Sequence, residues 1–102
     1  MKKIAIIPAR YASSRFPGKP LALLGNKPMI MWVYDAVSSS GLFDKVVVAT
    51  DDERIFKEVV SKQGVAMMTS ENHSCGTQRC QEVLQKLSSL GEKYDVVVNV
   101  QG

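Results

Sequence analysis

Three cations lie within ten residues near the start of the chain, and their types suit the binding of phosphate groups. They are Arg10, Arg15 and Lys19. Arginine presents a planar fork to two phosphate oxygens, and lysine presents a point charge. Because the three charges repel one another, an anion that joins them would hold the loop together. The segment therefore predicts a site for a polyphosphate, with a solvated basic loop as the alternative.

Short hydrogen-bond donors stand in the same segment. The backbone N–H groups of Ala9 and Arg10, just past a predicted strand, can point at phosphate oxygens. Ser13 and Ser14 add hydroxyl groups. A Walker-type phosphate loop is excluded, because that motif needs glycine and a hydroxyl residue where this chain has Ser13 and Pro20. The dinucleotide fingerprint G-x-G-x-x-G does not occur either.

A second polar segment, from His73 to Arg79, precedes a predicted helix that Ser74 or Thr77 could cap. His73 is the only histidine, and without a fixed partner it is weak support for a general base. For His73 we favour a place in the wall of a pocket. Cys75 as a nucleophile is disfavoured, because little around it would stabilise a thiolate.

The composition is that of a soluble globular domain, or of one part of a larger domain. The chain has 102 residues, of which 45% are hydrophobic and 23% are charged. No apolar run approaches the ~20 residues of a membrane span, and the start lacks the pattern of a secretory signal. We therefore expect a cytoplasmic protein without a membrane partner. Cys75 and Cys80 are expected to be reduced thiols, because their spacing fits neither a disulfide framework nor a zinc site.

Positive charge is concentrated in the first third of the chain. Residues 1–34 hold six cations and no acid, whereas residues 35–102 hold seven cations and ten acids, a balance of −3. A basic segment of this kind favours an anionic partner. Aromatic residues for stacking on bases are sparse in it and no nucleic-acid motif occurs, so a small polyphosphate is preferred to nucleic acid.

Hydrophobic periodicity predicts short strands that alternate with helices. The strands are expected at residues 3–8, 45–50, 65–68 and 95–100. The helices are expected from Pro28 to Gly41, from a cap at Asp51 or Asp52 to Gly64, and from Thr77 to Leu90, with residues 9–27 as a loop. The strands are continuous apolar runs, which is typical of parallel strands that are buried on both faces.

The alternation predicts an α/β fold, a doubly wound parallel sheet of Rossmann-like type. We expect the first strand to be central, with the second and third strands on one side and the fourth on the other. Ligands of such sheets bind beyond the carboxyl ends of the strands. The residues expected at that edge are 8–19, 50–52, 69–79 and 99–102.

The segment from Ile7 to Leu21 closely resembles the N-terminal signature of sugar-activating cytidylyltransferases, roughly IPARYxSxRxPGKPL. It is most similar to the signature of the members that act on 3-deoxy-manno-octulosonate (Kdo). The resemblance continues through residues 27–33, 46–52, 73–79 and 98–102, so it covers essentially the whole chain. It implies the nucleotide-diphospho-sugar transferase type of fold, in its N-terminal part only. Residues 1–102 would form the CTP-binding half of one domain.

The resemblance implies a reaction of CTP with Kdo that gives CMP-Kdo and pyrophosphate, with Mg²⁺, for lipopolysaccharide biosynthesis. It also implies a homodimer. Such catalysis consists mostly of positioning and charge stabilisation, for which Arg10, Arg15 and Lys19 are suited as catalytic residues. The implied nucleotide-binding residues are Pro8, Ala9, Arg10, Ser13, Ser14, Arg15, Lys19, Cys75, Gly76, Arg79 and Gln101. Of these, Arg79 would donate to the carbonyl of the base.

The chain departs from the resemblance at Cys75, where serine is usual, and at Gln78, where aspartate is usual. No metal ligand is assigned within it, because the Mg²⁺ ligands are expected beyond Gly102. The 102-residue chain alone is therefore expected to be inactive, and to self-associate through the edge of its last strand. Two alternatives stay open: a non-catalytic nucleotide-binding fragment, and a cytidylyltransferase for another acidic sugar.

Overall fold

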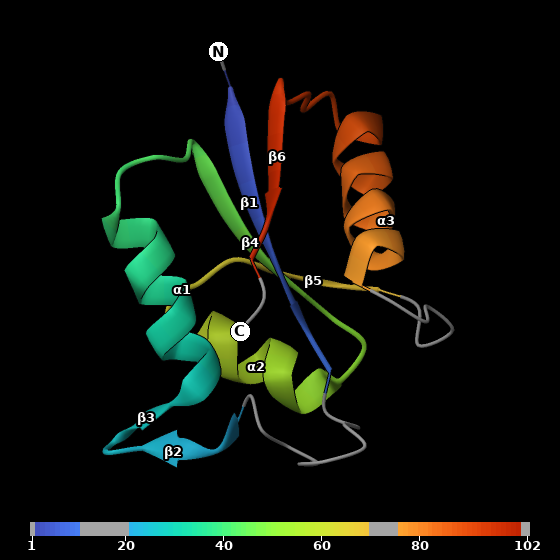
Figure 1. Cartoon of the computed structure of the whole chain (residues 1–102). Helices are drawn as coiled ribbons and strands as arrows, with labels where there is room; N and C mark the ends of the chain where they lie inside the picture. Colours follow the sequence, from blue (N-terminus) through green and yellow to red (C-terminus); the bar gives the residue numbers. More distant parts are fainter. Residues whose placement is uncertain (1, 11–20, 70–75, 101–102) are drawn as a thin grey trace.

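In the described residues, which are 2–10, 21–69 and 76–100, four parallel strands form a central sheet (Figure 1). The structure is a computed structural model, and for residues 76–78 only the backbone is described. The strands are β1 (Lys3–Ala9), β4 (Lys45–Thr50), β5 (Ala66–Met68) and β6 (Val96–Asn99). Their order in space is β5-β4-β1-β6. The prediction of a central first strand with the fourth strand on its other side is confirmed.

Helices cover both faces of the sheet (Figure 1). They are α1 (Met29–Ser39), α2 (Glu53–Ser61) and α3 (Gly76–Ser89). Successive side chains of a strand point to opposite faces. Ala5 and Ile7 of β1 therefore pack with α1 and α2, whereas Ile4 and Ile6 pack with α3. All four side chains are fully buried, which confirms the doubly wound α/β fold.

A short hairpin precedes α1, in a region where the sequence predicted only a loop. Its strands are β2 (Leu23–Leu24) and β3 (Lys27–Pro28), which pair antiparallel. Gly25 opens the two-residue turn with φ of 69°, a conformation that glycine adopts without a steric penalty. The indole Nε1–H of Trp32 donates to the backbone oxygen of Leu24 at 2.9 Å, which fastens the hairpin to α1. The Gly25-Asn26 pair directly after Leu23 and Leu24 was a usable hairpin signal.

The two candidate caps of α2 have separate roles. Asp52 is the N-cap residue, and its Oδ1 accepts the backbone N–H of Arg54 at 2.8 Å. The alternative that Asp51 caps α2 is wrong, because Asp51 Oδ2 faces the guanidinium of Arg79 at 3.5 Å. Thr77 as a cap of α3 is also wrong, because the helix begins at Gly76 and includes Thr77. The other candidate, Ser74, lies outside the described residues.

Strand β6 is an edge of the described sheet, since it pairs there with β1 alone. Val97 and Val98 are 40% and 36% exposed, so this edge carries apolar side chains, as the sequence predicted. Self-association through it stays a prediction. None of the described helices combines the length and the apolarity that a membrane span requires.

Removal of the Asp52 carboxylate should destabilise α2 in a pH-dependent way. Its carboxylate also pairs with the Arg54 guanidinium at 2.8 Å, and this side-chain hydrogen bond is the largest cause that lowers the pKa of Asp52 below 3.8, with burial opposing it. We expect Asp52→Ala to lower the free energy of unfolding at neutral pH by roughly 0.5–2 kcal/mol. Urea unfolding measures this difference.

The sign of the pH dependence follows from the lowered pKa. A carboxylate of this kind contributes its full stability above the unfolded-state pKa, and loses it as the pH falls through the folded-state pKa. The difference between wild type and Asp52→Ala should therefore be constant at neutral pH and shrink below the ordinary value of 3.8. Asp52→Asn is the control, because asparagine also caps helices. A difference that did not change with pH would contradict the role of the carboxylate.

Candidate functional site

The carboxyl ends of β1, β4 and β5 lie in register at one edge of the sheet. Ala9 is paired with Thr50, and Thr50 is paired with Met68. The next residues along the three strands are therefore neighbours in one row: Arg10, Asp51 and Thr69. The backbone holds this row in place, since the N–H of Thr69 donates to the oxygen of Thr50 at 2.8 Å.

Arg79, in the first turn of α3, reaches two residues of that row. Its Nη1 donates to the hydroxyl Oγ1 of Thr69 at 2.5 Å, and its Nη2 lies 3.5 Å from Oδ2 of Asp51. The guanidinium is 1% exposed, whereas the Asp51 side chain is 16% exposed. The ends of β4 and β5 and the start of α3 are therefore joined by one buried cation.

Burial of a guanidinium is unfavourable unless charge and hydrogen bonds compensate for the lost water. Asp51 supplies the opposite charge, and Thr69 supplies an acceptor. Both follow apolar strands directly, so each side chain stands where the sheet ends and the polar edge begins. We name the arrangement of Asp51, Thr69 and Arg79 the arginine cluster.

The predicted phosphate-binding residues fall partly within the structure. Pro8 and Ala9 end β1, with Ala9 4% exposed in the core, and Arg10 follows with an exposed side chain. Gly76 begins α3. The remaining predicted residues lie outside the described part of the chain, so their placement stays a prediction: Ser13, Ser14, Arg15, Lys19, Cys75 and Gln101.

The structure brings Arg79 to the predicted edge but buries its guanidinium. The family resemblance implied a direct hydrogen bond from Arg79 to the base, and that contact stays a prediction. The sequence missed the partners of Arg79. The available signal was the position of Asp51 and Thr69, each the first polar residue beyond an apolar strand.

The described residues hold no cluster of side chains typical of a metal site built by the protein alone. They contain no group of three or more carboxylate, thiol or imidazole side chains that could hold a metal ion. The adjacent carboxylates of Asp51 and Asp52 are engaged with Arg79 and with the N-terminus of α2. Because Mg²⁺ is usually held by one or two carboxylates together with phosphates and waters, an Mg²⁺ site at this edge would depend on a bound phosphate group as well as on the protein.

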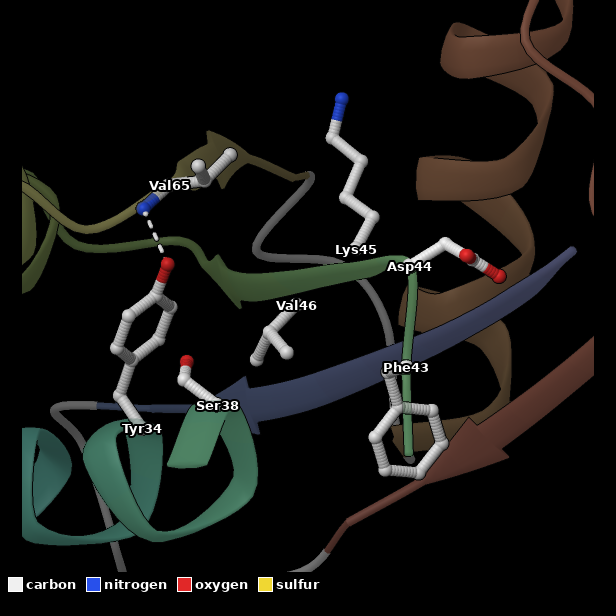
Figure 2. Close-up of a pocket in the computed structure, with 7 residues that line it drawn as sticks. All are labelled: Tyr34, Ser38, Phe43, Asp44, Lys45, Val46 and Val65. Carbon is white, nitrogen blue, oxygen red and sulfur yellow. Dashed lines mark hydrogen bonds between the residues drawn. The ribbon is translucent and has the colours of Figure 1, made fainter. Parts of the chain in front are cut away.

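A separate cavity of about 290 Å³ opens at the amino ends of β4 and β5, opposite the arginine cluster (Figure 2). The residues that line it are Tyr34, Ser38, Phe43, Asp44, Lys45, Val46 and Val65. Polar groups of its wall bind the fold itself: the Tyr34 hydroxyl accepts the N–H of Val65 at 3.2 Å, and the Asp44 carboxylate accepts the N–H of Lys3 at 2.7 Å. We therefore do not place the phosphate site there.

A network at the same amino edge shifts two pKa values for structural reasons. Glu92 accepts hydrogen bonds from Lys45 at 2.9 Å and from Tyr94 at 2.8 Å, and these bonds hold the pKa of Glu92 below its ordinary value. Burial, assisted by Glu92, raises the pKa of Tyr94 to about 12. The network joins the segment before β6 to the start of β4, so it serves the fold.

The sequence matches a known family over nearly its whole length. A profile of the family described as cytidylyltransferase matches residues 4–102. The chain therefore belongs to the cytidylyltransferase family. The parallel sheet and the polar edge beyond the carboxyl ends of its strands are the parts of the fold that such a protein needs to hold a nucleotide.

Two relatives and one solved structure are similar to the chain over nearly its whole length. The 3-deoxy-manno-octulosonate cytidylyltransferases of Phocaeicola vulgatus and Parabacteroides distasonis are 57% and 56% identical to this chain over 102 residues. A solved structure of CMP:2-keto-3-deoxy-manno-octonic acid synthetase complexed with CTP is 42% identical and covers 99% of the chain with a TM-score of 0.90. The chain spans 38%, 39% and 40% of the lengths of these three proteins.

The buried and the exposed arginine of this edge should differ in their effect on stability. Arg79→Met removes a buried cation and leaves the Asp51 carboxylate without its charge partner. We expect a loss of about 2–4 kcal/mol in the free energy of unfolding. Arg10→Met makes the same exchange at an exposed side chain and should change stability by less than about 0.5 kcal/mol. Urea unfolding of both variants is the measurement, and equal losses would contradict the structural role of the arginine cluster.

Proposed function

We propose that the protein that carries this chain is a 3-deoxy-manno-octulosonate cytidylyltransferase. The observation that carries the proposal is the 57% identity to such an enzyme over all 102 residues. The 42% identical structure complexed with CTP supports the same nucleotide. Residues 1–102 would supply the nucleotide-binding half of the cytidylyltransferase domain. The protein would serve lipopolysaccharide biosynthesis in the cytoplasm, as a homodimer.

In the proposed reaction the anomeric hydroxyl oxygen of Kdo attacks the α-phosphorus of CTP. A bond forms between this oxygen and phosphorus, the hydroxyl proton is lost to water, and the bond from the α-phosphorus to the bridging oxygen breaks, so that pyrophosphate leaves. Negative charge accumulates on the leaving group. Positive side chains fixed near it lower the barrier because they need no reorganisation during the reaction.

The described residues support a phosphate role for the segment that follows β1. Arg10 is exposed directly beyond the central strand, whose end is fixed by pairing with β4. A cation in that place can meet a phosphate without moving the core. Arg15 and Lys19 follow within nine residues, and we assign them to the β- and γ-phosphates. Mg²⁺ is part of the proposal, with ligands from residues after Gly102.

Pyrophosphate release by the intact protein, the full natural chain that carries these residues, tests the function. CTP and Kdo with Mg²⁺ should release pyrophosphate and form CMP-Kdo, which chromatography can identify. Release with a different sugar acid, and none with Kdo, would overturn the substrate and keep the class of enzyme. No release with any sugar acid would overturn the class.

The basic segment should contribute through charge-assisted contacts. In the intact protein, Arg15→Ala and Lys19→Ala should each lower kcat/KM for CTP roughly 10- to 150-fold, the equivalent of one contact to a charged group. Arg15→Lys should also be poor, because an ammonium cannot reproduce a bidentate fork. Lys57→Ala, at an exposed lysine of α2, is the matched control and should keep full activity. Full activity of Arg15→Lys would refute the bidentate role.

A further inference from the structure

Asp51 stands between two arginines at the carboxyl edge of the sheet. Ala49 packs on the α3 side of the sheet, so Asp51, two residues later, belongs to the same face. Ala9 packs on the opposite side, so the alternation of side chains returns Arg10 to the α3 face. Because β1 and β4 end in register, the backbones of Arg10 and Asp51 are one strand spacing apart, about 4.8 Å. Arg79 reaches the same carboxylate from α3.

The Asp51 carboxylate is paired with the buried arginine and not with the exposed one. Its Oδ2 lies 3.5 Å from Nη2 of Arg79, whose guanidinium is 1% exposed. Among the described residues, none of the ion pairs includes Arg10, whose side chain is exposed. No described acid therefore has to release Arg10 before a phosphate group can bind it.

Two features of its surroundings hold Arg79 on Asp51. The Nη1 of Arg79 donates to the hydroxyl of Thr69 at 2.5 Å, while its Nη2 faces Asp51, so the planar guanidinium is fixed at both ends. Arg79 also lies in the first turn of α3, where the helix dipole disfavours a positive charge. The nearby carboxylate compensates for this charge, so the two groups neutralise each other.

The next acid along the chain is also paired with an arginine. The Oδ2 of Asp52 lies 2.8 Å from Nη2 of Arg54. Both acids at the end of β4 therefore face a positive charge. A carboxylate without such a partner beside a phosphate site would repel the phosphates and attract the cation that should bind them, and both effects would weaken binding.

We propose that Arg79 is a positioning residue of the phosphate site, because it neutralises Asp51 and so keeps Arg10 available to the nucleotide. Arg79 acts through Asp51 and needs no contact with the nucleotide for this role. The proposal rests on the proposed function, because that function assigns Arg10 to a phosphate of CTP. It gives the buried ion pair a role in binding as well as in stability.

The proposal and its alternatives differ in the effect of removing both members of the pair. If Arg79 contacted the base, or if Asp51 held Mg²⁺, the double variant would bind CTP at least as weakly as the single variants. If Arg79 neutralises Asp51, its loss weakens binding only while Asp51 is present. A role in stability alone would change the folded fraction and leave the affinity of the folded protein unchanged. A double-mutant cycle therefore separates the three roles.

The first test measures CTP binding by calorimetry on the intact protein with Mg²⁺. Arg79→Met should raise the dissociation constant for CTP roughly tenfold, as for loss of one contact to a charged group. The double variant Asp51→Asn with Arg79→Met should restore wild-type affinity, and it should fold because it buries no uncompensated charge. Weak CTP binding by the double variant would overturn the proposal. Wild-type affinity of Arg79→Met alone would overturn it as well.

The second test keeps the proposal decidable if Arg79→Met does not fold. Arg79→Gln removes the charge but keeps N–H donors, so it should fold more readily and still weaken CTP binding. Arg54→Gln is the matched control: it frees Asp52, which faces the N-terminus of α2, and should leave CTP binding unchanged. Equal effects of the two exchanges, or wild-type affinity of Arg79→Gln, would contradict the positioning role.

Calorimetry needs no sugar acid, so this proposal and the proposed function can fail separately. A wild type that bound CTP but released no pyrophosphate would refute the proposed reaction alone. A wild type that did not bind CTP would refute both proposals.

Discussion

The burial of β1 on both faces is the constraint on which the rest of the described structure depends. Residues 4–7 have no exposed surface, and the strand is hydrogen-bonded to β4 on one side and to β6 on the other. A strand in this position needs helices on both faces, and parallel neighbours need crossover connections to supply them. The helices α1, α2 and α3 meet this need. Because the strands are parallel, their carboxyl ends meet at one edge, and the polar segments after them are brought together.

Charged side chains differ in burial between the amino ends and the carboxyl ends of the strands, which form the amino edge and the carboxyl edge of the sheet. At the amino edge, Lys45 and Glu92 form a partly exposed ion pair with 26% and 35% of their side-chain surface accessible, and the Tyr94 hydroxyl donates to the same Glu92 carboxylate. Pairs of this exposure contribute little to stability, and this one joins neighbouring segments. At the carboxyl edge the Arg79 guanidinium is 1% exposed. A buried cation tolerates few alternative arrangements, because every lost contact leaves an uncompensated charge. The charged side chains at the carboxyl edge are therefore held in a more specific arrangement than those at the amino edge.

Both the family and the geometry bear on the place of the proposed nucleotide site. The relatives match the chain from end to end, and the structure that matches it with a TM-score of 0.90 was solved with CTP. The end of β1 presents an exposed Arg10 beyond a buried Ala9. At the other edge, the cavity wall contains Tyr34 and Asp44, whose side chains accept hydrogen bonds from backbone N–H groups of the fold. We therefore favour the carboxyl edge, where the exposed Arg10 follows a buried strand, for the proposed nucleotide site.

The sequence by itself predicted the order of the three helices and of the four strands of the main sheet, and the usual topology of doubly wound folds then predicted the arrangement of these strands. Continuous apolar runs at residues 4–7 and 46–49 are compatible with strands buried on both faces, and glycines and capping residues separate them from amphipathic helices. These are local properties, because each depends on residues close together in the chain. The phosphate interpretation of residues 8–19 was local in the same sense. The family resemblance began with one continuous segment, Ile7 to Leu21, and extended through further segments that are each local in the chain.

Only the tertiary structure decided which aspartate has which role. Asp51 and Asp52 are adjacent and chemically identical, and both could cap α2 as far as the sequence shows. Asp52 caps the helix, and Asp51 faces Arg79, which is 28 positions away in the chain and enters from α3. Neighbouring residues at a strand end point in different directions, so one turns toward the following helix and the other toward the opposite layer. That choice depends on the packing of α3 against the sheet, and no spacing within the sequence encodes it.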